Sequence, residues 1–148
     1  MAITGNKGEW SEIYTLFKLL GDGVVYAGDG NMQKINNLFY PILKVIRQEQ
    51  DLYEYSPNQG GNRMVIIEEN GTEIMRISMN DFVVQARQLL RDIKKASAAA
   101  FPLPNTERFM ASIKCSTLKA RSVDKTDIRI IIHDLRTGMA PLLGFSIK

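Results

Sequence analysis

The sequence predicts an α+β fold, partly α/β-like, in which helices flank a mixed sheet. Two observations predict it. Apolar residues recur at helical spacing in two long segments, and runs rich in β-branched residues lie between turn residues elsewhere in the chain. A chain of 148 residues has the length of one domain, residues 1–148, and is long enough to bury a single core.

The first helix is expected from Lys7 to Leu20, and the glycines of Gly21–Gly23 end it. With a 3.6-residue period, its apolar residues form one face: Trp10, Ile13, Leu16, Phe17 and Leu20. Glu9 projects about 40° from the centre of this face and Glu12 about 100°, at its margin. Glu9 therefore has two interpretations, a carboxylate that stabilises the helix amino-terminus or an acid that reaches a functional site.

The middle of the chain predicts strands. We expect a short strand and turn in Val24–Gly30, a brief helix or loop in Lys34–Leu38, and a strand in Tyr40–Gln48, because Pro41 discourages a helix there. Residues 56–62 have the composition of a polar loop. The segments 64–68 and 73–78 are expected to form a hairpin across Asn70–Gly71, a strong turn signal.

A long helix is expected from Phe82 to about Ala98, with a cap within Ser78–Asp81. Its buried stripe comprises Phe82, Ala86, Leu89, Leu90 and Ile93. Arg87, Arg91 and Lys95 recur on another face, as a solvated surface or as a ridge that contacts DNA phosphates. After a break in residues 98–105, a short helix is expected from residue 105 or 106 to about residue 113 or 115.

The end of the chain predicts a β-hairpin, with a β-branched run from Lys125 to Asp134 and a short apolar run from residue 142 to Lys148. A reversal centred on Thr137–Gly138 would set Asp127 opposite Lys148, with both side chains on one face. Ser146 shares that face, and Ile147 leaves its carbonyl at the edge. The arrangement suits a metal and a water, although a strand that begins with an acid and ends with a lysine is the simpler interpretation.

Charge is unevenly distributed along the chain. Residues 1–84 hold 7 Lys and Arg against 11 Asp and Glu, whereas residues 85–148 hold 12 against 5. Because neutralised phosphates release counterions, positive charge beside a site favours a nucleic-acid ligand. The cations before Asp127, namely Lys114, Lys119, Arg121 and Lys125, are the best candidates for phosphate contacts.

Several classes of site are excluded by composition. The single cysteine, Cys115, rules out an internal disulfide and a cysteine-based zinc site, and is a poor candidate nucleophile. The single histidine, His133, makes no Ser/His/Asp triad. The sequence contains no signal peptide and no apolar run of membrane-spanning length, so we expect a soluble cytoplasmic protein.

The segment Lys119–Lys148 resembles the HpaII family of type II restriction endonucleases, within the wider PD-(D/E)xK nuclease group. Its Thr-Asp, hydrophobic strand, Asp-x-x-x-Gly and Gly-Phe-Ser-Ile-Lys carry the resemblance. The opening Asn6–Glu12 and the middle segment Tyr40–Arg47 are similar too, so the resemblance covers essentially the whole chain. Two positions depart from the group name: Thr126 replaces its proline and Ser146 its acid.

The resemblance implies hydrolysis of double-stranded DNA at a short palindromic, CCGG-like site by a restriction-endonuclease-like fold that is a homodimer at full length. Asp127, Glu9 and the Ile147 carbonyl would hold Mg²⁺. Lys148 would orient the attacking water, and Ser146 would bind a metal-ligated water. Whether Glu9 or Glu12 is the helix acid stays open.

The resembled proteins continue beyond the last strand, so we expect this chain to be their amino-terminal portion and to be inactive alone. A second interpretation is a non-catalytic module that binds DNA or another protein. It predicts DNA retention with a steep dependence on salt and no need for Mg²⁺.

Overall fold

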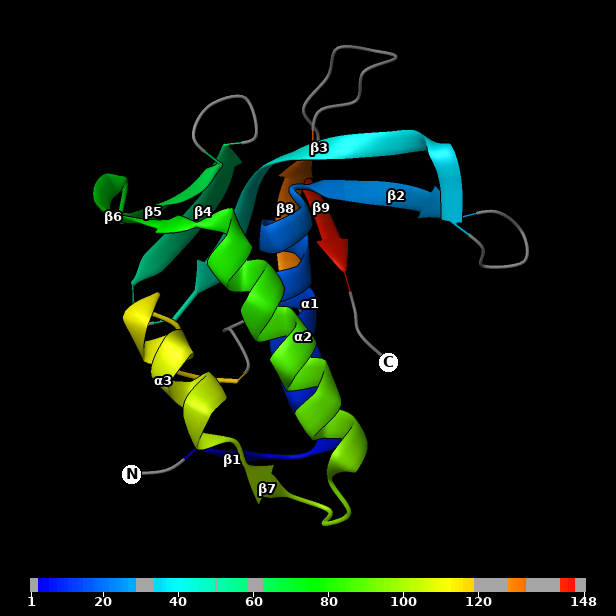
Figure 1. Ribbon diagram of the computed structural model, residues 1–148. Coiled ribbons are helices and arrows are strands. Elements are labelled where there is room, and N and C mark those ends of the chain that lie inside the picture. Colours follow the sequence, from blue (N-terminus) through cyan, green and yellow to red (C-terminus); the bar gives the residue numbers. More distant parts are fainter. Residues whose placement is uncertain are drawn as a thin grey trace.

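The computed structural model describes residues 3–28, 34–49, 51–58, 63–118, 128–132 and 142–145. It confirms the α+β class, with helices packed against a sheet (Figure 1). In chain order the elements are β1 (Thr4–Gly5), α1 (Lys7–Asp22), β2 (Val24–Gly28), β3 (Lys34–Gln48), β4 (Leu52–Asn58), β5 (Met64–Glu69), β6 (Thr72–Ser78), α2 (Met79–Lys95), β7 (Phe101–Pro102), α3 (Pro104–Ser112), β8 (Ile128–Ile132) and β9 (Leu142–Phe145).

Strand β3 organises the main sheet. Its strand order is β6-β5-β4-β3-β8-β9, and β2 pairs with the first part of β3. Every strand pairing in the described residues is antiparallel, so this part of the expected mixed sheet is an antiparallel one. Strand β8, which comes late in the sequence, therefore lies directly beside β3.

The prediction of a brief helix or loop in Lys34–Leu38 is wrong, because β3 already begins at Lys34. Pro41 lies within this strand and pairs with Val24 of β2. Among the described residues the pairing of β3 with β8 begins at Ile42, and Pro41 takes no part in it. A residue without an N–H is tolerated at such a position.

Strand β4 was not predicted, because Ser56–Asn58 have the composition of a loop. In the structure β4 pairs with β3 only as far as Tyr55, while its pairing with β5 continues to Asn58. Pro57 thus lies where the strand has one neighbour instead of two, and proline is accepted at a sheet edge. The predicted hairpin across Asn70–Gly71 is confirmed, with β5 and β6 on either side of that turn.

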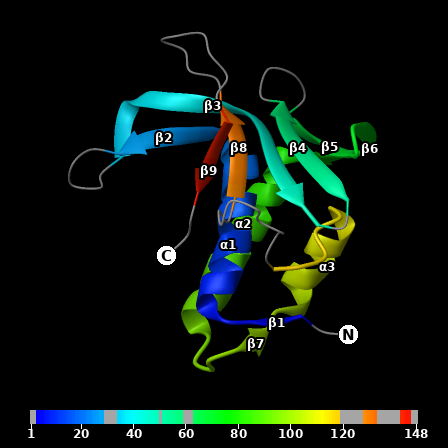
Figure 2. The same cartoon turned by 180° about the vertical axis from the view of Figure 1, so that it is seen from behind.

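Helix α1 lies at the centre of the molecule. It is behind α2 in Figure 1 and in front of α2 in the reverse view of Figure 2, where β8 and β9 cross in front of α1. The predicted apolar face is fully buried, and the Trp10 indole Nε1 donates to the Phe101 carbonyl at 3.0 Å. That bond ties the helix to β7.

Three phenylalanines join the helices. Phe17 of α1, Phe82 of α2 and Phe109 of α3 meet edge to face, with ring centroids 5.2 to 6.1 Å apart. Such aromatic pairs add about 0.5–1.5 kcal/mol each beyond the burial of their area. The cluster therefore fixes α3 against the first two helices.

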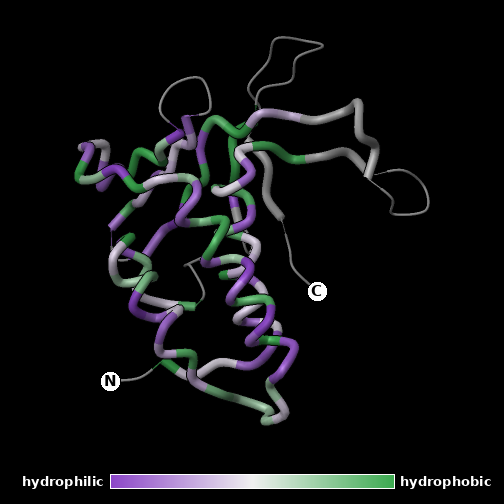
Figure 3. Tube along the Cα trace, in the orientation of Figure 1, coloured by the Kyte–Doolittle hydropathy of each residue, from purple (hydrophilic) through white to green (hydrophobic). Residues whose placement is uncertain are grey.

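Helix α2 follows the predicted pattern. The Ser78 hydroxyl accepts a hydrogen bond from the Asn80 N–H at 3.1 Å and caps the helix, which ends at Lys95 instead of Ala98. Four of the five predicted stripe residues are buried, and Leu90 is half-buried. Hydrophilic and hydrophobic positions alternate along α2 as expected for a helix with one buried face (Figure 3).

The crossing of α1 and α2 depends on Gly21. A Cβ at this position would lie 2.8 Å from Val83 Cγ2 and 3.0 Å from the Val83 backbone nitrogen. We expect Gly21→Ala to destabilise the protein by about 1–3 kcal/mol, because the helices must separate. Urea unfolding measures this change.

Gly8→Ala is the matched control for Gly21→Ala. A Cβ at Gly8 meets only the Asn6 side chain, at 3.4 Å, which is ordinary contact. Alanine is about 1 kcal/mol better than glycine within a helix, so this control should be neutral or stabilising. Equal losses in both variants would contradict a close helix crossing at Gly21.

Candidate active site

The predicted terminal hairpin is present as β8 and β9, but its register differs from the prediction. Ile128 pairs with Phe145, and Ile131 pairs with Leu142. The expected reversal at Thr137–Gly138 would have paired residue 128 with residue 147, two positions further on. Because a two-residue shift leaves every side chain on its face, the alternation of apolar residues does not distinguish these registers.

Most predicted site residues lie outside the described residues. These are Asp127, Ser146, Ile147 and Lys148 of the catalytic set, the phosphate-contact candidates Lys119, Arg121 and Lys125, and also His133 and Asp134. Their placement stays a prediction. The structure does describe the strands that adjoin these residues in the sequence, β8 and β9, and their neighbour β3.

Three strand ends meet at one end of the sheet. Ile46 of β3 pairs with Arg129 of β8, and Ile128 of β8 pairs with Phe145 of β9. Because these pairings are antiparallel, the last residues of β3 and of β9 lie beside the first residues of β8. We call this place the open end of the hairpin.

Glu9 caps its own helix. Its Oε1 accepts from the Asn6 N–H at 3.1 Å, and its own N–H donates to Asn6 Oδ1 at 2.8 Å, which is a capping box. Both donors at the helix start are thereby satisfied. Glu9 itself is half-buried. This is the local role that the helix amino-terminus interpretation predicts.

Glu12 is the buried acid of α1, with 3% of its surface exposed. The expectation that Glu9 lies within the buried face and Glu12 at its margin is therefore wrong. Glu9 turns back to the Asn6 N–H at the helix start, whereas its neighbour Trp10 is fully buried. Angular position alone therefore does not determine which acid is buried.

Arg47 and Glu49 form a buried ion pair near the open end of the hairpin. The Arg47 Nε lies 3.1 Å from Glu49 Oε2, and the two side chains are only 4% and 6% exposed. Charged side chains are rarely buried to this degree unless they are paired and hydrogen-bonded. Arg47 shares the inner face of the sheet with Val45, two residues before it.

The same pair holds a segment far along the chain. Glu49 accepts hydrogen bonds from the Ser116 N–H, at 3.1 Å to Oε1, and from the Ser116 hydroxyl. Arg47 donates through Nη2 to the Thr117 carbonyl. We did not predict this cluster from the sequence. An Arg and a Glu two residues apart, at the end of a buried strand, were the available signal.

Cys115 is an inert thiol. Its side chain is 1% exposed, and burial raises the pKa of the thiol from 9.0 to about 11, with Arg47 opposing and Glu49 and Glu12 adding to the shift. Nearby, the Tyr55 hydroxyl donates to the Ile113 carbonyl at 3.0 Å, and burial raises the pKa of Tyr55 well above 10.0.

We expect Cys115 in the folded protein to react with a thiol-specific disulfide reagent at least about a hundredfold more slowly than a free cysteine near neutral pH. A thiol pKa of about 11 instead of 9.0 reduces the thiolate fraction near neutral pH by that factor, and burial slows the reaction further. Absorbance of the released thiolate measures the rate. Unfolding in urea should restore the ordinary rate, and rapid labelling of the folded protein would contradict the burial.

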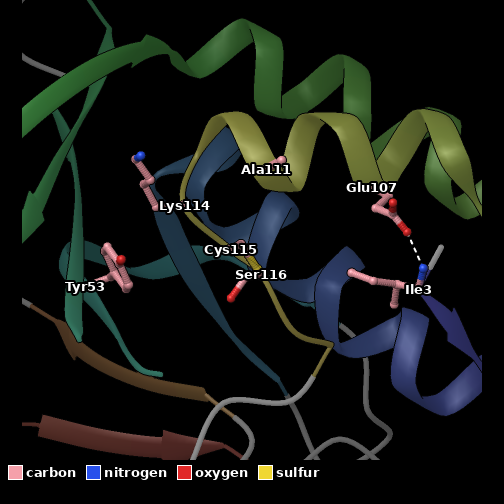
Figure 4. A pocket seen from close by; sticks show the side chains of 7 residues that line it. All are labelled: Ile3, Tyr53, Glu107, Ala111, Lys114, Cys115 and Ser116. Atoms are coloured by element: carbon pink, nitrogen blue, oxygen red, sulfur yellow. Dashed lines mark hydrogen bonds between the residues drawn. The ribbon is translucent and has the colours of Figure 1, made fainter. Parts of the chain in front are cut away.

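A pocket of about 360 Å³ lies beside Cys115 (Figure 4). Ile3, Tyr53, Glu107, Ala111, Lys114, Cys115 and Ser116 line it. Glu107 accepts from the Ile3 N–H, and the Tyr53 hydroxyl donates to Glu69 at 2.8 Å, a bond that raises the pKa of Tyr53 to about 12. With these polar groups engaged inside the protein and the thiol protonated, the pocket offers no activated nucleophile.

Basic side chains of α2 face solvent. Arg87, Arg91 and Lys95 are all exposed, and Arg91 donates to Gln88 at 3.2 Å. No group of three acidic, histidine or cysteine side chains within the described ranges is placed to hold a metal ion. Among the helices described, none is long and apolar enough to cross a membrane.

The chain is similar to known proteins over nearly its whole length. Residues 6–148 match the family model of the HpaII restriction endonuclease. The chain belongs to the HpaII restriction endonuclease family. It is 44% identical over 146 residues to the type II restriction enzyme HpaII of Haemophilus parainfluenzae. The aligned region covers 98% of this chain and 40% of the Haemophilus enzyme. No solved structure matched the chain. The chain thus spans two fifths of the length of this member of its family, and includes the α1 opening and the β8–β9 hairpin.

Proposed function

We propose that the protein carrying this chain is a type II restriction endonuclease that hydrolyses double-stranded DNA at a short, palindromic, CCGG-like site with the help of Mg²⁺. The observation that carries the proposal is the 44% identity to a type II restriction enzyme over 98% of the chain. Because a palindromic site has two-fold symmetry, a homodimer suits it. The cytoplasm is the compartment in which such an enzyme would meet DNA, and its reducing conditions suit the single thiol.

The open end of the hairpin supports a site built from Asp127, Ser146, Ile147 and Lys148. Asp127 is joined by one peptide bond to Ile128, and Ser146 by one to Phe145, which are partners across β8 and β9. Consecutive Cα atoms are about 3.8 Å apart, and this short connection to paired residues supports a shared site for Asp127 and Ser146. Lys148 follows two residues later.

Glu12 is the better candidate than Glu9 for the acid from the helix. The Glu9 carboxylate already accepts a hydrogen bond from the Asn6 N–H at the start of α1. The charge of Glu12 acts on Cys115, as do the charges of Arg47 and Glu49, so all three belong to the surroundings of this thiol. The burial of Glu12 and this shared electrostatic environment favour it over Glu9 as the acid from the helix.

Carboxylate and carbonyl oxygens of this kind are the ligands that Mg²⁺ takes. When bound, the metal would polarise the scissile phosphate and lower the pKa of a bound water. Asp127 and Glu12 would supply negative charge that holds the cation, and the Ile147 carbonyl a neutral oxygen. The Lys148 ammonium would orient the attacking water and offset the charge that develops on the phosphate.

Incubation of plasmid DNA with the protein carrying this chain and Mg²⁺ tests the proposal. Discrete fragments that share one end sequence, and that a chelator abolishes, are expected. DNA binding with a steep dependence on salt, no cleavage and no response to Mg²⁺ would support the alternative, a non-catalytic DNA-binding module. Absence of DNA binding at low salt would contradict both functions.

Lys119, Arg121 and Lys125 are the proposed phosphate contacts. We expect simultaneous reversal of their charges to weaken binding to every duplex by about the same factor. The slope of log affinity against log salt should decrease by the contribution of about three phosphate contacts. Phosphate contacts carry no direct sequence information, so specificity should change little. Fluorescence anisotropy of a labelled duplex at several salt concentrations measures both quantities.

Reversal of charge at Arg87, Arg91 and Lys95 is the matched control, because these exposed residues carry the same three charges on α2. An unchanged salt slope after substitution of the first set, with a reduced slope after substitution of this control set, would move the DNA interface to α2.

A further inference from the structure

We propose that Arg129 of β8 binds a backbone phosphate of duplex DNA on the face of the sheet that is turned away from α1. This inference rests on the proposed function, because it takes DNA as the source of the phosphate. The binding site consists of the Arg129 side chain and its pairing partners on the neighbouring strands, Ile46 of β3 and Gly144 of β9.

Arg129 lies on the outer face of the sheet, which we define as the face away from α1. The next residue, Ile130, and also Ile132 are buried, so both face the core. Because successive side chains of a strand point to opposite faces, Arg129 projects outward, and it is half-buried. In Figure 2 α1 lies behind β8 and β9, so the outer face of these strands is turned toward the viewer.

The two partners of Arg129 in the sheet carry no charge. Ile46 pairs with it on one side and Gly144 on the other. Side chains of directly paired residues share one face and lie about 5 Å apart, so an acid at either position would form an ion pair with the guanidinium. The sequence has an isoleucine and a glycine there instead. Neither paired position therefore supplies Arg129 with an acid.

The next acid along this row of paired residues is already engaged. Glu54 of β4 pairs with Ile46, which places it two strands, or about 10 Å, from Arg129. Its carboxylate lies 3.2 Å from the Lys44 ammonium. Among the residues that the structure describes, Arg129 makes no ion pair. Its positive charge is thus available to an anion from outside these residues.

A phosphodiester is the anion that suits this site. The guanidinium presents a planar fork of N–H donors that matches two phosphate oxygens. Because Gly144 has no side chain, the space beside Arg129 over β9 is open, and a glycine within a strand is typical of places where a ligand approaches the backbone closely. Partial burial also shields the charge from water, which strengthens its attraction for an anion.

Arg129→Gln tests the site in the protein carrying this chain. Fluorescence anisotropy of a labelled duplex at several salt concentrations should show an affinity at least about tenfold lower, a typical loss for a hydrogen bond to a charged group. The slope of log affinity against log salt should decrease by the contribution of about one phosphate contact. Arg129→Lys keeps the charge but not the planar fork, so it should keep the slope and lose part of the affinity.

Arg76→Gln is the matched control. Arg76 of β6 pairs with Ile66, whose two neighbours in β5 are buried, so Arg76 shares the outer face of the sheet. Its guanidinium lies 3.0 Å from Glu73 and so already has an acid. The control removes the same single charge from the same face, and DNA affinity and salt slope should stay as in the original protein.

Titration with inorganic phosphate, followed by the NMR signal of Arg129 Nε, distinguishes DNA from a free anion as the source of the phosphate. Lower affinity and a smaller slope in Arg129→Gln support the proposal whether or not free phosphate shifts this signal. A shift of the signal together with unchanged DNA affinity in Arg129→Gln would show that the site holds free phosphate and would overturn the assignment to DNA.

Two further outcomes separate this inference from the proposed function. If the original protein cleaves DNA but Arg129→Gln binds it with unchanged affinity and slope, or loses no more than Arg76→Gln, the inference is overturned and the proposed function stands. If the original protein binds no DNA, the proposed function and the assignment to DNA both fail, while the phosphate titration still decides whether Arg129 forms an anion site.

Discussion

Asp127→Asn is expected to lower the rate of site-specific DNA cleavage by about a hundredfold to a thousandfold or more, a loss of the size seen when one charge-stabilising group is removed from a catalytic site. The amide keeps the shape of the carboxylate but not the negative charge that would hold Mg²⁺. Single-turnover cleavage of plasmid DNA measures the rate, and calorimetric titration measures the metal affinity, which should fall as well.

Asp134→Asn is the control for Asp127. Both acids flank β8, but Asp127 directly precedes Ile128, whose partner Phe145 leads to Ser146 and Lys148, whereas Asp134 follows the other end of the strand. Asp134→Asn should therefore retain cleavage and metal binding. Equal losses in the two variants would show that the open end of the hairpin is not the site.

The helix acid can be assigned by the same assays. Glu12→Gln should reduce cleavage and weaken metal binding, because it removes the buried carboxylate from the proposed site. Glu9→Gln should retain cleavage. Because the glutamine amide can still accept the capping hydrogen bond, the stability of the protein should fall by no more than about 1 kcal/mol. Loss of cleavage in Glu9→Gln alone would return the role to Glu9.

The sequence predicted the helices well because their signals are local. The period of apolar residues in α1, the Ser78 cap of α2 and the glycines after residue 20 each act within a few residues of where they occur. The failure at Glu9 and Glu12 shows the limit of such signals. Periodicity gives the angle about the helix axis, but the segments that pack against each turn of the helix are distant in the sequence.

The strands were predicted less completely, for a reason visible at two prolines. Pro41 and Pro57 disfavour a strand interior as single residues, but within the described part of the chain each pairs with a strand on one side: Pro41 with Val24 and Pro57 with Val65. That information belongs to the sheet order. The hairpin register was wrong by two residues for a related reason, since alternation fixes which face is buried and not which residues are partners.

The candidate site was predicted only in part, as a set of residue types near one hairpin. The Arg47–Glu49 pair was missed because its partners, Ser116 and Thr117, lie 67 to 70 residues further along the chain. An Arg near the end of a strand and a Glu directly after that strand are ambiguous in sequence, because the sequence does not show which distant residues they contact.

Glu49→Ala is expected to destabilise the protein by about 3–5 kcal/mol, the usual cost of breaking a buried ion pair from one side. Arg47 would remain as a buried guanidinium, 4% exposed, without its carboxylate, and the Ser116 donors would lose their acceptor. Urea unfolding followed by circular dichroism measures the change. At this magnitude a substantial fraction of the total stability of an ordinary domain is removed.

The Lys44–Glu54 pair provides the control for this loss, because it has a similar distance, 3.2 Å, but Lys44 is 36% exposed. Glu54→Gln should cost no more than about 1 kcal/mol, since water solvates whichever charge remains. Comparable losses from Glu49→Ala and Glu54→Gln would contradict the burial of the Arg47–Glu49 pair.

Replacement of both charges distinguishes stability from positioning. Arg47→Met combined with Glu49→Leu should recover much of the stability that Glu49→Ala loses, because no unpaired charge stays buried and apolar side chains of similar volume fill the space. The hydrogen bonds to Ser116 and Thr117 would still be absent, so the amides of residues 115–118 should exchange faster than in the original protein. A double variant less stable than Glu49→Ala would contradict the cost assigned to the unpaired buried charge.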